Sequence, residues 1–475
     1  MNNLNSRQRK LLYALGILVL LIPIIYFGAP VSRDVKVDDA SVEGGYLAQL
    51  RHDHQLGETT LGEIDPSSSA MNLVLLGMKG MAVCYLHQNA IEYQERKDWA
   101  KLRETVDSII MLQPHYREIW KFQGWNLAYN VSREWDKVDD RYFWVKEGIK
   151  FIQEGTNRNQ KIPILFHNVG EFISSKMGIS DEKKFFRQYF VSDPNVEKFN
   201  GGADTDINPK GIDSFLVAYD WFTLANAKDD LYDMTGMTHV FFRQGPPKAR
   251  LSYAEAQQKD GLENEEARQA NRAAWDEGYR EWMEVYGVYE FRGLHDWKYK
   301  LNSTEEDLVQ MAEENGISLD DQRNLWARNV DMVHYRFWRD YANAERDPET
   351  VAAHQAFFEG KKAYNEARSV DRYVKGKEEY EKSDAERLFD EAMQKWVRVF
   401  EKYPNMSVDS QSYIDEALLT VYYWIKVHEN NGRKPPTEFP LKTFWEGNAD
   451  RRPEIEREFM MDAIRVQPEE TPAGG

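Results

Sequence analysis

Apolar residues recur along this chain at steps of three and four, the spacing of amphipathic helices. Between residues 83 and 196 they follow one two-helix pattern that occurs three times, with an insertion in the second copy at about residues 130–141. The marker residues are Leu86, Asn89, Ala90, Tyr93, Leu102, Val106, Ile109 and Pro114; Trp120, Gln123, Gly124, Leu127, Gly148, Ile152, Gly155 and Gln160; and Phe166, Val169, Gly170, Ile173, Glu182, Phe186, Tyr189 and Pro194. The pattern predicts three successive helix hairpins.

The residue types suit this packing. In each first helix (helix A), a small residue (Ala90, Gly124 or Gly170) is expected to let the second helix (helix B) approach closely. The proline after the first and third copies ends helix B because it cannot continue the hydrogen-bonded turn. Asp98 and Trp99 fall in the turn between the helices of the first copy.

This pattern resembles the tetratricopeptide repeat, a unit of about 34 residues with the signature W-x2-L-G-x2-Y, A-x3-F and Pro. The copies depart from it at Asn89 (Leu in the signature), at Gln160 (Pro) and at Glu182 (Ala). The resemblance implies a superhelix whose concave face binds a protein or peptide segment. The positions it assigns to that groove are Cys84, His87, Ile91 and Gln94; Glu118, Lys121, Trp125 and Ala128; and Ile164, His167, Glu171 and Ser174. From these we select His87, Gln94, Lys121, Trp125, His167 and Glu171 as partner-binding candidates, with Lys121 and Trp125 as the main anchors. The alternative is that later helices cover this face.

Other segments are also predicted to be helical. Aromatic residues at helical spacing, typical of a core, occur at Trp275, Tyr279, Trp282 and Tyr286 and again at Tyr335, Trp338 and Tyr341. The repeat spacing returns weakly in residues 353–404, and strand patterns are nearly absent. We therefore predict an all-α fold, a TPR-like helical hairpin solenoid with an N-terminal transmembrane helix. The predicted segments are a tail (1–10), a transmembrane anchor (11–28), a linker (29–70), repeats (71–196), a helical middle region (197–345), C-terminal TPR-like helices (346–447) and a polar tail (448–475).

The N-terminus has the pattern of a membrane anchor. Arg7, Arg9 and Lys10 precede a stretch from Leu11 to Phe27 that carries no charge. Extended to Pro30, the stretch has about the 20 residues that a spanning helix needs. The basic flank predicts a cytoplasmic N-terminus, with the rest of the chain on the other side of the inner membrane, in the periplasm. A cleaved signal peptide is the alternative, although no clear cleavage site follows. The combination resembles bacterial membrane-anchored helical-repeat proteins.

Composition narrows the possible partners. The net charge of −18 argues against nucleic acid, which requires a basic surface. The single cysteine, Cys84, excludes disulfides within one chain and zinc sites that need several cysteines. We expect Cys84 to be packed on a helix. The insertion at 130–141 is either part of the binding face or a longer solvated helix end.

Few residues have the spacing of a metal site. His52 and His54 lack a third ligand, and His167 with Glu171 lacks the second histidine of H-E-x-x-H. Asp204, Asp206 and Asn208 begin like a calcium loop, but Pro209 replaces the required glycine and Phe215 the final glutamate. A cation site with oxygen ligands in a less regular arrangement remains an alternative at these residues. Phosphate-binding and nucleophile motifs are absent from the sequence, and we predict no metal, cofactor or catalytic residue.

Two other functions remain open. An acidic, aromatic-rich helical chain is also typical of (α/α)-barrel carbohydrate-active enzymes, with Asp220 beside Trp221 and Asp296 beside Trp297 as candidate paired carboxylates. A structural spacer or oligomerisation role is the second alternative. We favour a membrane-anchored scaffold or binding protein that recognises a protein or peptide outside the cytosol.

Overall fold

The computed structural model describes residues 15–17, 19, 79–232, 237–260, 264–366, 368–374 and 379–465. These residues are mostly helical, with two small hairpins as the strands, so the predicted all-α class is confirmed. The chain divides into two compact units at Met237 and Thr238. Among the described residues, no helix combines the length and apolar character needed to cross a membrane.

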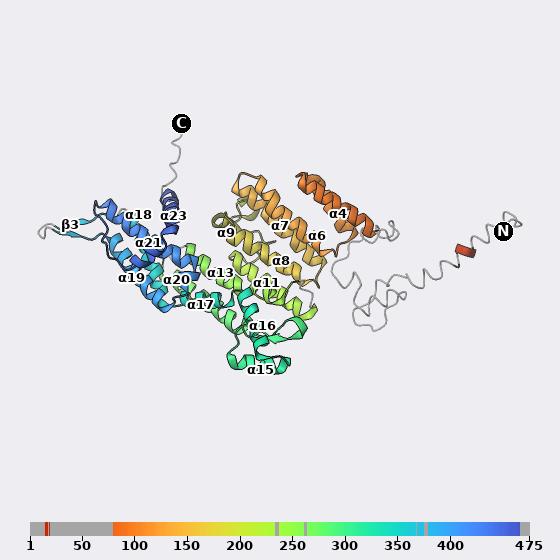
Figure 1. Ribbon diagram of the computed structural model, residues 1–475. Helices are drawn as coiled ribbons and strands as arrows, with labels where there is room; N and C mark the ends of the chain where they lie inside the picture. Colours follow the sequence, from red (N-terminus) through yellow and green to blue (C-terminus); the bar gives the residue numbers. More distant parts are fainter. Residues whose placement is uncertain are drawn as a thin grey trace, which may run out of the picture. The chain divides into compact units, whose positions relative to one another are not determined.

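The first unit is built from successive helices that lie side by side (Figure 1). They are α4 (Lys79–Glu95), α5 (Trp99–Leu112), α6 (Arg117–Trp125), η2 (Asn126–Val131), η3 (Ser132–Glu134), α7 (Val138–Arg158), α8 (Pro163–Phe172), η4 (Ile173–Ile179), α9 (Lys183–Val191), α10 (Val196–Phe199) and α11 (Ser214–Tyr232). The helices α6 and α8 continue without a break into the π-helical segments η2 and η4.

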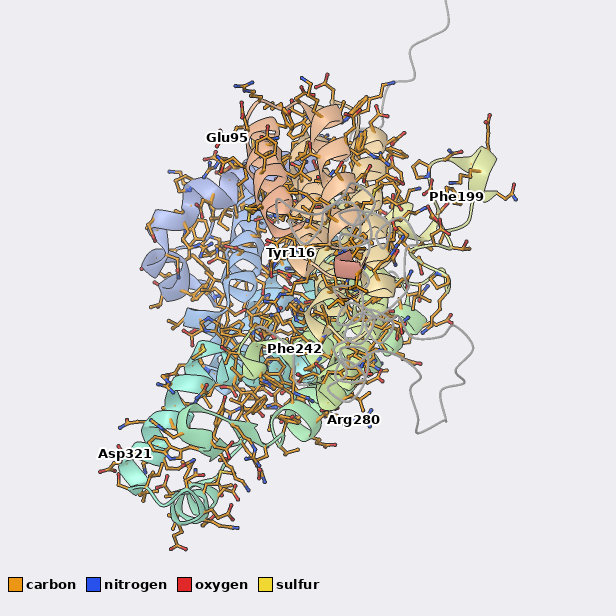
Figure 2. The ribbon with its side chains drawn as sticks, turned by 90° about the vertical axis from the view of Figure 1, so that its right-hand side faces the viewer. Glu95, Tyr116, Phe199, Phe242, Arg280 and Asp321 are labelled. Atoms are coloured by element: carbon orange, nitrogen blue, oxygen red, sulfur yellow. The ribbon has the colours of Figure 1, made fainter. Side chains whose placement is uncertain are left out.

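The helix ends follow the sequence signals. Asp98 caps α5 by accepting a hydrogen bond from the backbone N–H of Lys101 (3.3 Å), because its carboxylate meets an N–H that the helix leaves free. The helix α5 ends two residues before Pro114. Glu95, before the turn into α5, and Tyr116, after the turn out of it, flank the two ends of this helix (Figure 2).

Glycines bring α6 and α7 together. A Cβ atom on Gly148 would lie 2.6 Å from the backbone oxygen of Gly124, and a Cβ on Gly124 would lie 2.4 Å from Ile152. The ring of Trp120 packs against Gly155, and its indole N–H donates to the carbonyl of Pro114 (2.9 Å). The two helices of the second hairpin therefore pack with their backbones close together, and a hydrogen bond joins this hairpin to the end of the first.

The third hairpin differs from our prediction. Gly170 does not face helix α9, because a Cβ there would meet Phe222 (2.9 Å) and the carbonyl of Ala218 (3.1 Å), both on α11. The helix α9 is short and packs on the η4 end of the preceding helix. The rest of α8 is therefore available to α11, which we had assigned to the middle region of the chain.

The loop between α9 and α11 is fixed by buried charges. Lys146 of α7 lies 2.6 Å from Asp193 and 3.1 Å from Asp204, and all three residues are buried. Lys150 lies 2.8 Å from Asp204 and 2.7 Å from Asp206. Phe199, on the projecting part of the loop, packs under the Lys146 ammonium (4.6 Å; Figure 2). Lysine side chains thus occupy the place of the cation that an oxygen-ligand site would hold.

The second unit contains further helices and two antiparallel hairpins. Its elements are α12 (His239–Phe242), α13 (Gly245–Asp260), α14 (Glu265–Arg280), η5 (Glu281–Tyr286), β1 (Phe291–Arg292), η6 (Leu294–Asp296), β2 (Lys298–Tyr299), α15 (Glu305–Asn315), α16 (Leu319–Met332), α17 (Tyr335–Glu345), α18 (Pro348–Asn365), β3 (Arg372–Val374), β4 (Glu379–Glu381), α19 (Asp384–Lys402), α20 (Met406–Asp409), α21 (Gln411–Asn430), α22 (Lys442–Gly447), η7 (Ala449–Arg451) and α23 (Arg452–Arg465).

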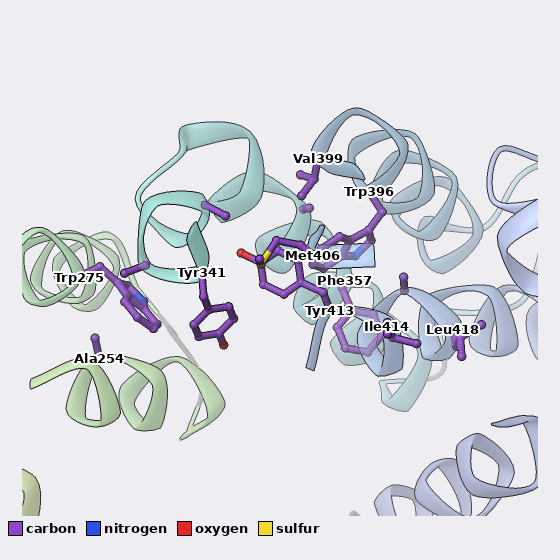
Figure 3. Packing of buried hydrophobic residues seen from close by; sticks show 14 of the residues in the cluster. Ala254, Trp275, Tyr341, Phe357, Trp396, Val399, Met406, Tyr413, Ile414 and Leu418 are labelled. Atoms are coloured by element: carbon purple, nitrogen blue, oxygen red, sulfur yellow. The ribbon is translucent and has the colours of Figure 1, made fainter. Parts of the chain in front are cut away.

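The core of this unit is a run of aromatic rings. Trp275 contacts Tyr341 (5.5 Å between ring centroids), Tyr341 contacts Tyr413 (5.6 Å), and Tyr413 contacts Trp396 (5.1 Å; Figure 3). Trp282 is also fully buried. Both predicted aromatic stripes therefore contribute to the core.

The pair α18 and α19 occupies the segment where the repeat spacing returns. A Cβ on Gly360 of α18 would lie 2.7 Å from the ring of Phe389 on α19, and α19 ends two residues before Pro404. The β3–β4 hairpin is inserted between the two helices, with Tyr373 opposite Tyr380.

The segment that we predicted to be a polar tail contains helix α23. Ile455 is buried, and Phe459 packs on Tyr423 (4.8 Å). Two apolar residues one turn apart are enough to hold an otherwise polar helix. The tail at 1–10, the anchor at 11–28 apart from residues 15–17 and 19, the linker at 29–70, the start of the first repeat at 71–78 and the C-terminus from residue 466 lie outside the described residues.

The glycine contact between α6 and α7 can be tested by substitution. We expect Gly148→Ala to lower the free energy of unfolding by about 1–3 kcal/mol, because its Cβ would meet backbone that no rotamer change can move. Gly80→Ala on α4 is the matched control, since its Cβ meets nothing within 4 Å, and a stability gain of up to about 1 kcal/mol is expected. Thermal denaturation followed by circular dichroism measures both. Equal effects would refute the packing argument.

Candidate functional site

The predicted groove positions of two hairpins meet in one pocket. It has a volume of about 300 Å³ and is lined by residues of α6 and α8 together with Met237. The lining residues are Arg117, Glu118, Lys121, Ile164, Leu165, His167, Asn168, Glu171 and Met237. Five of them are groove positions in the repeat pattern: Glu118, Lys121, Ile164, His167 and Glu171.

Helix geometry explains why these residues converge. Glu118 and Lys121 are three residues apart on α6, so they lie on one face. His167 and Glu171 are four residues apart on α8 and share a face in the same way. The helix α7 packs against both α6 and α8 and holds these faces toward a common space.

The pocket holds one cation and one carboxylate that are not neutralised. Lys121 and Glu171 are both exposed, and neither makes an ion pair within the part of the chain that the structure describes. The other two charged lining residues neutralise each other, since Arg117 Nε donates to Glu118 at 2.8 Å. A ligand here meets a positive and a negative group on neighbouring helices.

His167 and Asn168 form the buried polar part of the pocket. His167 packs against Phe222 of α11 (4.8 Å between centroids). Burial, and secondarily the charge of Lys121, lower the pKa of His167 to about 4, so the ring is neutral at pH 7. Asn168 is almost fully buried, and its Oδ1 accepts no hydrogen bond from the described residues. An unsatisfied buried amide oxygen is costly, so a ligand N–H or water is expected there.

The predicted anchor Trp125 lies outside the pocket lining, next to a second aromatic ring. It is 41% exposed and stacks on Tyr129 with 5.3 Å between ring centroids. The ammonium of Lys176 sits 3.9 Å from the Tyr129 ring centroid, and the Tyr129 hydroxyl is 2.9 Å from Ser175 Oγ. These contacts join the π-helical segments η2 and η4. The stacked indole presents a flat, partly exposed surface.

The two candidate residues on the first hairpin lie away from the pocket. His87 is half-buried and packs between Tyr116 and Phe122 (6.3 and 6.0 Å between centroids), and Gln94 is half-buried near the end of α4. Neither lines the pocket. Cys84, which we expected to be packed, is exposed.

Comparison with known proteins gives no relative for this chain. No family model, no curated protein and no solved structure matches it. The function of this chain is therefore inferred from the geometry of its own residues.

The candidate carboxylates of the enzyme alternative lie on the surface in ion pairs. Asp220 is 2.6 Å from Lys210, and Asp296 is 2.6 Å from Arg292. Both side chains are open to solvent, unlike the buried general acid of a glycoside hydrolase. No set of three metal-ligating side chains occurs among the described residues, and His52 and His54 lie outside them.

Sequence reasoning missed several features of the site. Arg117, Leu165, Asn168 and Met237 line the pocket, although the repeat pattern does not assign them to the groove. A buried asparagine inside an apolar helix was the available signal for Asn168. In the insertion at 130–141, residues 130–134 continue helix A through η2 and η3, and residues 138–141 already belong to α7; Trp135, between the two parts, stacks on Trp144 (6.3 Å).

The buried His167 predicts acid sensitivity. Its pKa is about 4 when folded and 6.5 in the reference state, so the unfolded chain binds the proton first. Stability from this group is complete above pH 6.5 and is lost as the pH falls toward 4. Chemical denaturation of the wild type should show an acid-induced loss between pH 8 and pH 4.5 that is about 2–3 kcal/mol larger than in His167→Gln. Identical pH profiles would contradict a buried neutral ring.

Proposed function

We propose that this chain is a membrane-anchored, TPR-like helical-repeat scaffold that binds an extended segment of a protein or peptide outside the cytosol. The observation that carries the proposal is the pocket of about 300 Å³ in which groove positions from two successive hairpins converge. Three of our six partner-binding candidates, Lys121, His167 and Glu171, line it.

The helix bounds support the repeat interpretation. Three hairpins in the first unit, and α18 with α19 in the second, begin and end near the places that the repeat pattern assigns. The contact between Gly124 and α7 has the role that the pattern gives its small residue. The packing of Gly170 on α11 is the departure; α11 also covers His167 through Phe222, and the pocket lies on the remaining part of that side of α8.

The chemistry of the pocket favours a peptide. A peptide carries carboxylates and ammonium or guanidinium groups, which suit Lys121 and Glu171, and backbone N–H groups, which suit the Asn168 oxygen. Trp125 adds a rigid aromatic surface, the kind of residue that dominates binding energy at interfaces. We therefore expect a segment with an acidic and a basic side chain within a few residues of each other.

Partner binding is tested by a double substitution with a matched control. A photo-crosslinking residue at Glu118 captures the partner in cells, and the crosslinked segment is then synthesised as a labelled peptide. Fluorescence polarisation with the full chain should show at least a tenfold loss of affinity for Lys121→Glu with Trp125→Ala, because a charge and a flat contact are lost.

The control replaces the same residue types outside the groove. Trp135→Ala with Lys137→Glu removes a tryptophan that is 44% exposed and an exposed lysine, so peptide affinity should stay within about twofold of the wild type. If the groove variant binds as tightly as this control, the groove is not the binding site.

The single cysteine tests the proposed topology. Cys84 is exposed and follows the apolar stretch at 11–28, so anchoring through that stretch places its thiol outside the cytosol. We expect a membrane-impermeant maleimide to label Cys84 in cells with an intact inner membrane. Labelling should disappear in Cys84→Ser. Labelling that requires lysis would reverse the topology.

A further inference from the structure

A second polar pocket lies in the second unit, between α13 and α14 on one side and the end of α17 with α18 on the other. Its lining includes Gln258, Asn271, Glu345, Val351, His354 and Phe358. The enclosed space is about 40 Å³, which is room for about three water molecules.

A histidine lies between two carboxylates at this pocket. His354 Nδ1 is 2.8 Å from Glu416, and Nε2 is 3.3 Å from Glu345. Burial alone would lower the pKa of His354, but the two carboxylates outweigh it and raise the pKa to about 10. The ring is therefore an imidazolium at neutral pH. With both glutamates ionised, the three groups together keep one negative charge.

Glu345 carries the unsatisfied part of that charge. The residue is 1% exposed, and its Oε1 receives no hydrogen bond of good geometry from the described residues. The hydroxyls of Tyr341 and Tyr413 interact with the Glu345 carboxylate, and the pKa of both hydroxyls is raised by burial and then by the charge of Glu345. A buried carboxylate that shares one imidazolium with a second carboxylate lacks part of its neutralising charge, which is costly away from water.

The neighbouring groups define which donor fits. Arg268 also lines the pocket, but its guanidinium is paired with Glu265 (3.0 Å). Asn271 donates its amide to the carbonyl of Ala254 (2.7 Å). Val351 and Phe358 give the pocket hydrocarbon walls, which favour an alkyl chain over a hydrated inorganic ion.

We propose that this pocket binds the head of an unbranched primary alkylammonium, with its N–H groups on Glu345 and its methylenes between Val351 and Phe358. Such a head has up to three donors and one positive charge, and it offsets the remaining negative charge of the cluster. The group can come from a free alkylamine or from a lysine side chain of another protein.

Calorimetric titration of the full chain at pH 7.5 distinguishes a pocket that binds an alkylammonium from one that holds water only. We expect n-propylammonium chloride to bind with a Kd on the order of 1 mM, as its small size permits, and the neutral isostere n-propanol not to bind. A tripeptide with a central lysine tests the side-chain source, and binding of either amine supports the proposal. Binding of n-propanol at equal affinity, or of neither amine, overturns it and leaves a pocket that holds water only.

Two substitutions locate the site. Glu345→Gln keeps the shape and removes the charge, so propylammonium affinity should fall at least tenfold. Because this change touches the buried histidine, Phe358→Lys provides a second variant. Phe358 is 38% exposed, so the fold should tolerate lysine there, and the new ammonium at the wall should repel the ligand and lower its affinity at least tenfold. Unchanged affinity in a folded Phe358→Lys protein overturns the assignment.

Discussion

The backbone of α7 lies against the backbone of α6 at Gly148 and Gly124, and the arrangement of the first unit depends on this contact. With a Cβ on Gly148, which would lie 2.6 Å from the backbone oxygen of Gly124, the two helices would have to separate. The helix α7 also packs on α8, so it holds α6 and α8 at a fixed spacing although those two touch each other little. The pocket between them exists because a third helix supports both from behind. A helical solenoid, the architecture that we propose for this unit, makes a binding surface in the same way, since each hairpin packs only on its neighbours.

Period-3.6 spacing predicted the hairpins well because apolar burial and helix caps are local properties. The bounds of α5, α8 and α19 follow from Asp98, Pro163 and Pro404, which act within a turn of their own position. The π-helical segments η2 and η4 could not be predicted, since widening a helix by one residue leaves no mark on a pattern read by residue type. The partner of Gly170 could not be predicted either. A glycine permits close approach, but which helix approaches depends on the length of the loop before α11.

Part of the candidate site was likewise accessible from the sequence. The repeat positions identified Lys121, His167 and Glu171, because a position in the repeat determines the face of the helix on which a residue lies. Asn168 and the half-buried setting of His87 depend on side-chain packing between helices, which spacing does not encode. The core positions of Trp275 and Tyr341 were predictable because large aromatic rings at helical spacing are rarely left in water.

Buried charges in this protein fall into two kinds, and the contrast bears on function. Around Lys146, two lysines pair with the two buried aspartates Asp193 and Asp204 and fasten a loop, so the fold supplies an ammonium group for each buried carboxylate; the third aspartate, Asp206, is exposed. At Asn168 a buried oxygen faces a pocket and receives no hydrogen bond from the described residues, and at Glu345 one imidazolium is shared between two carboxylates beside a pocket. A chain that can neutralise buried charge as completely as it does at Lys146 shows that its fold can supply the partners. Where it leaves such an oxygen beside an open space, the missing donor is most simply supplied by a ligand.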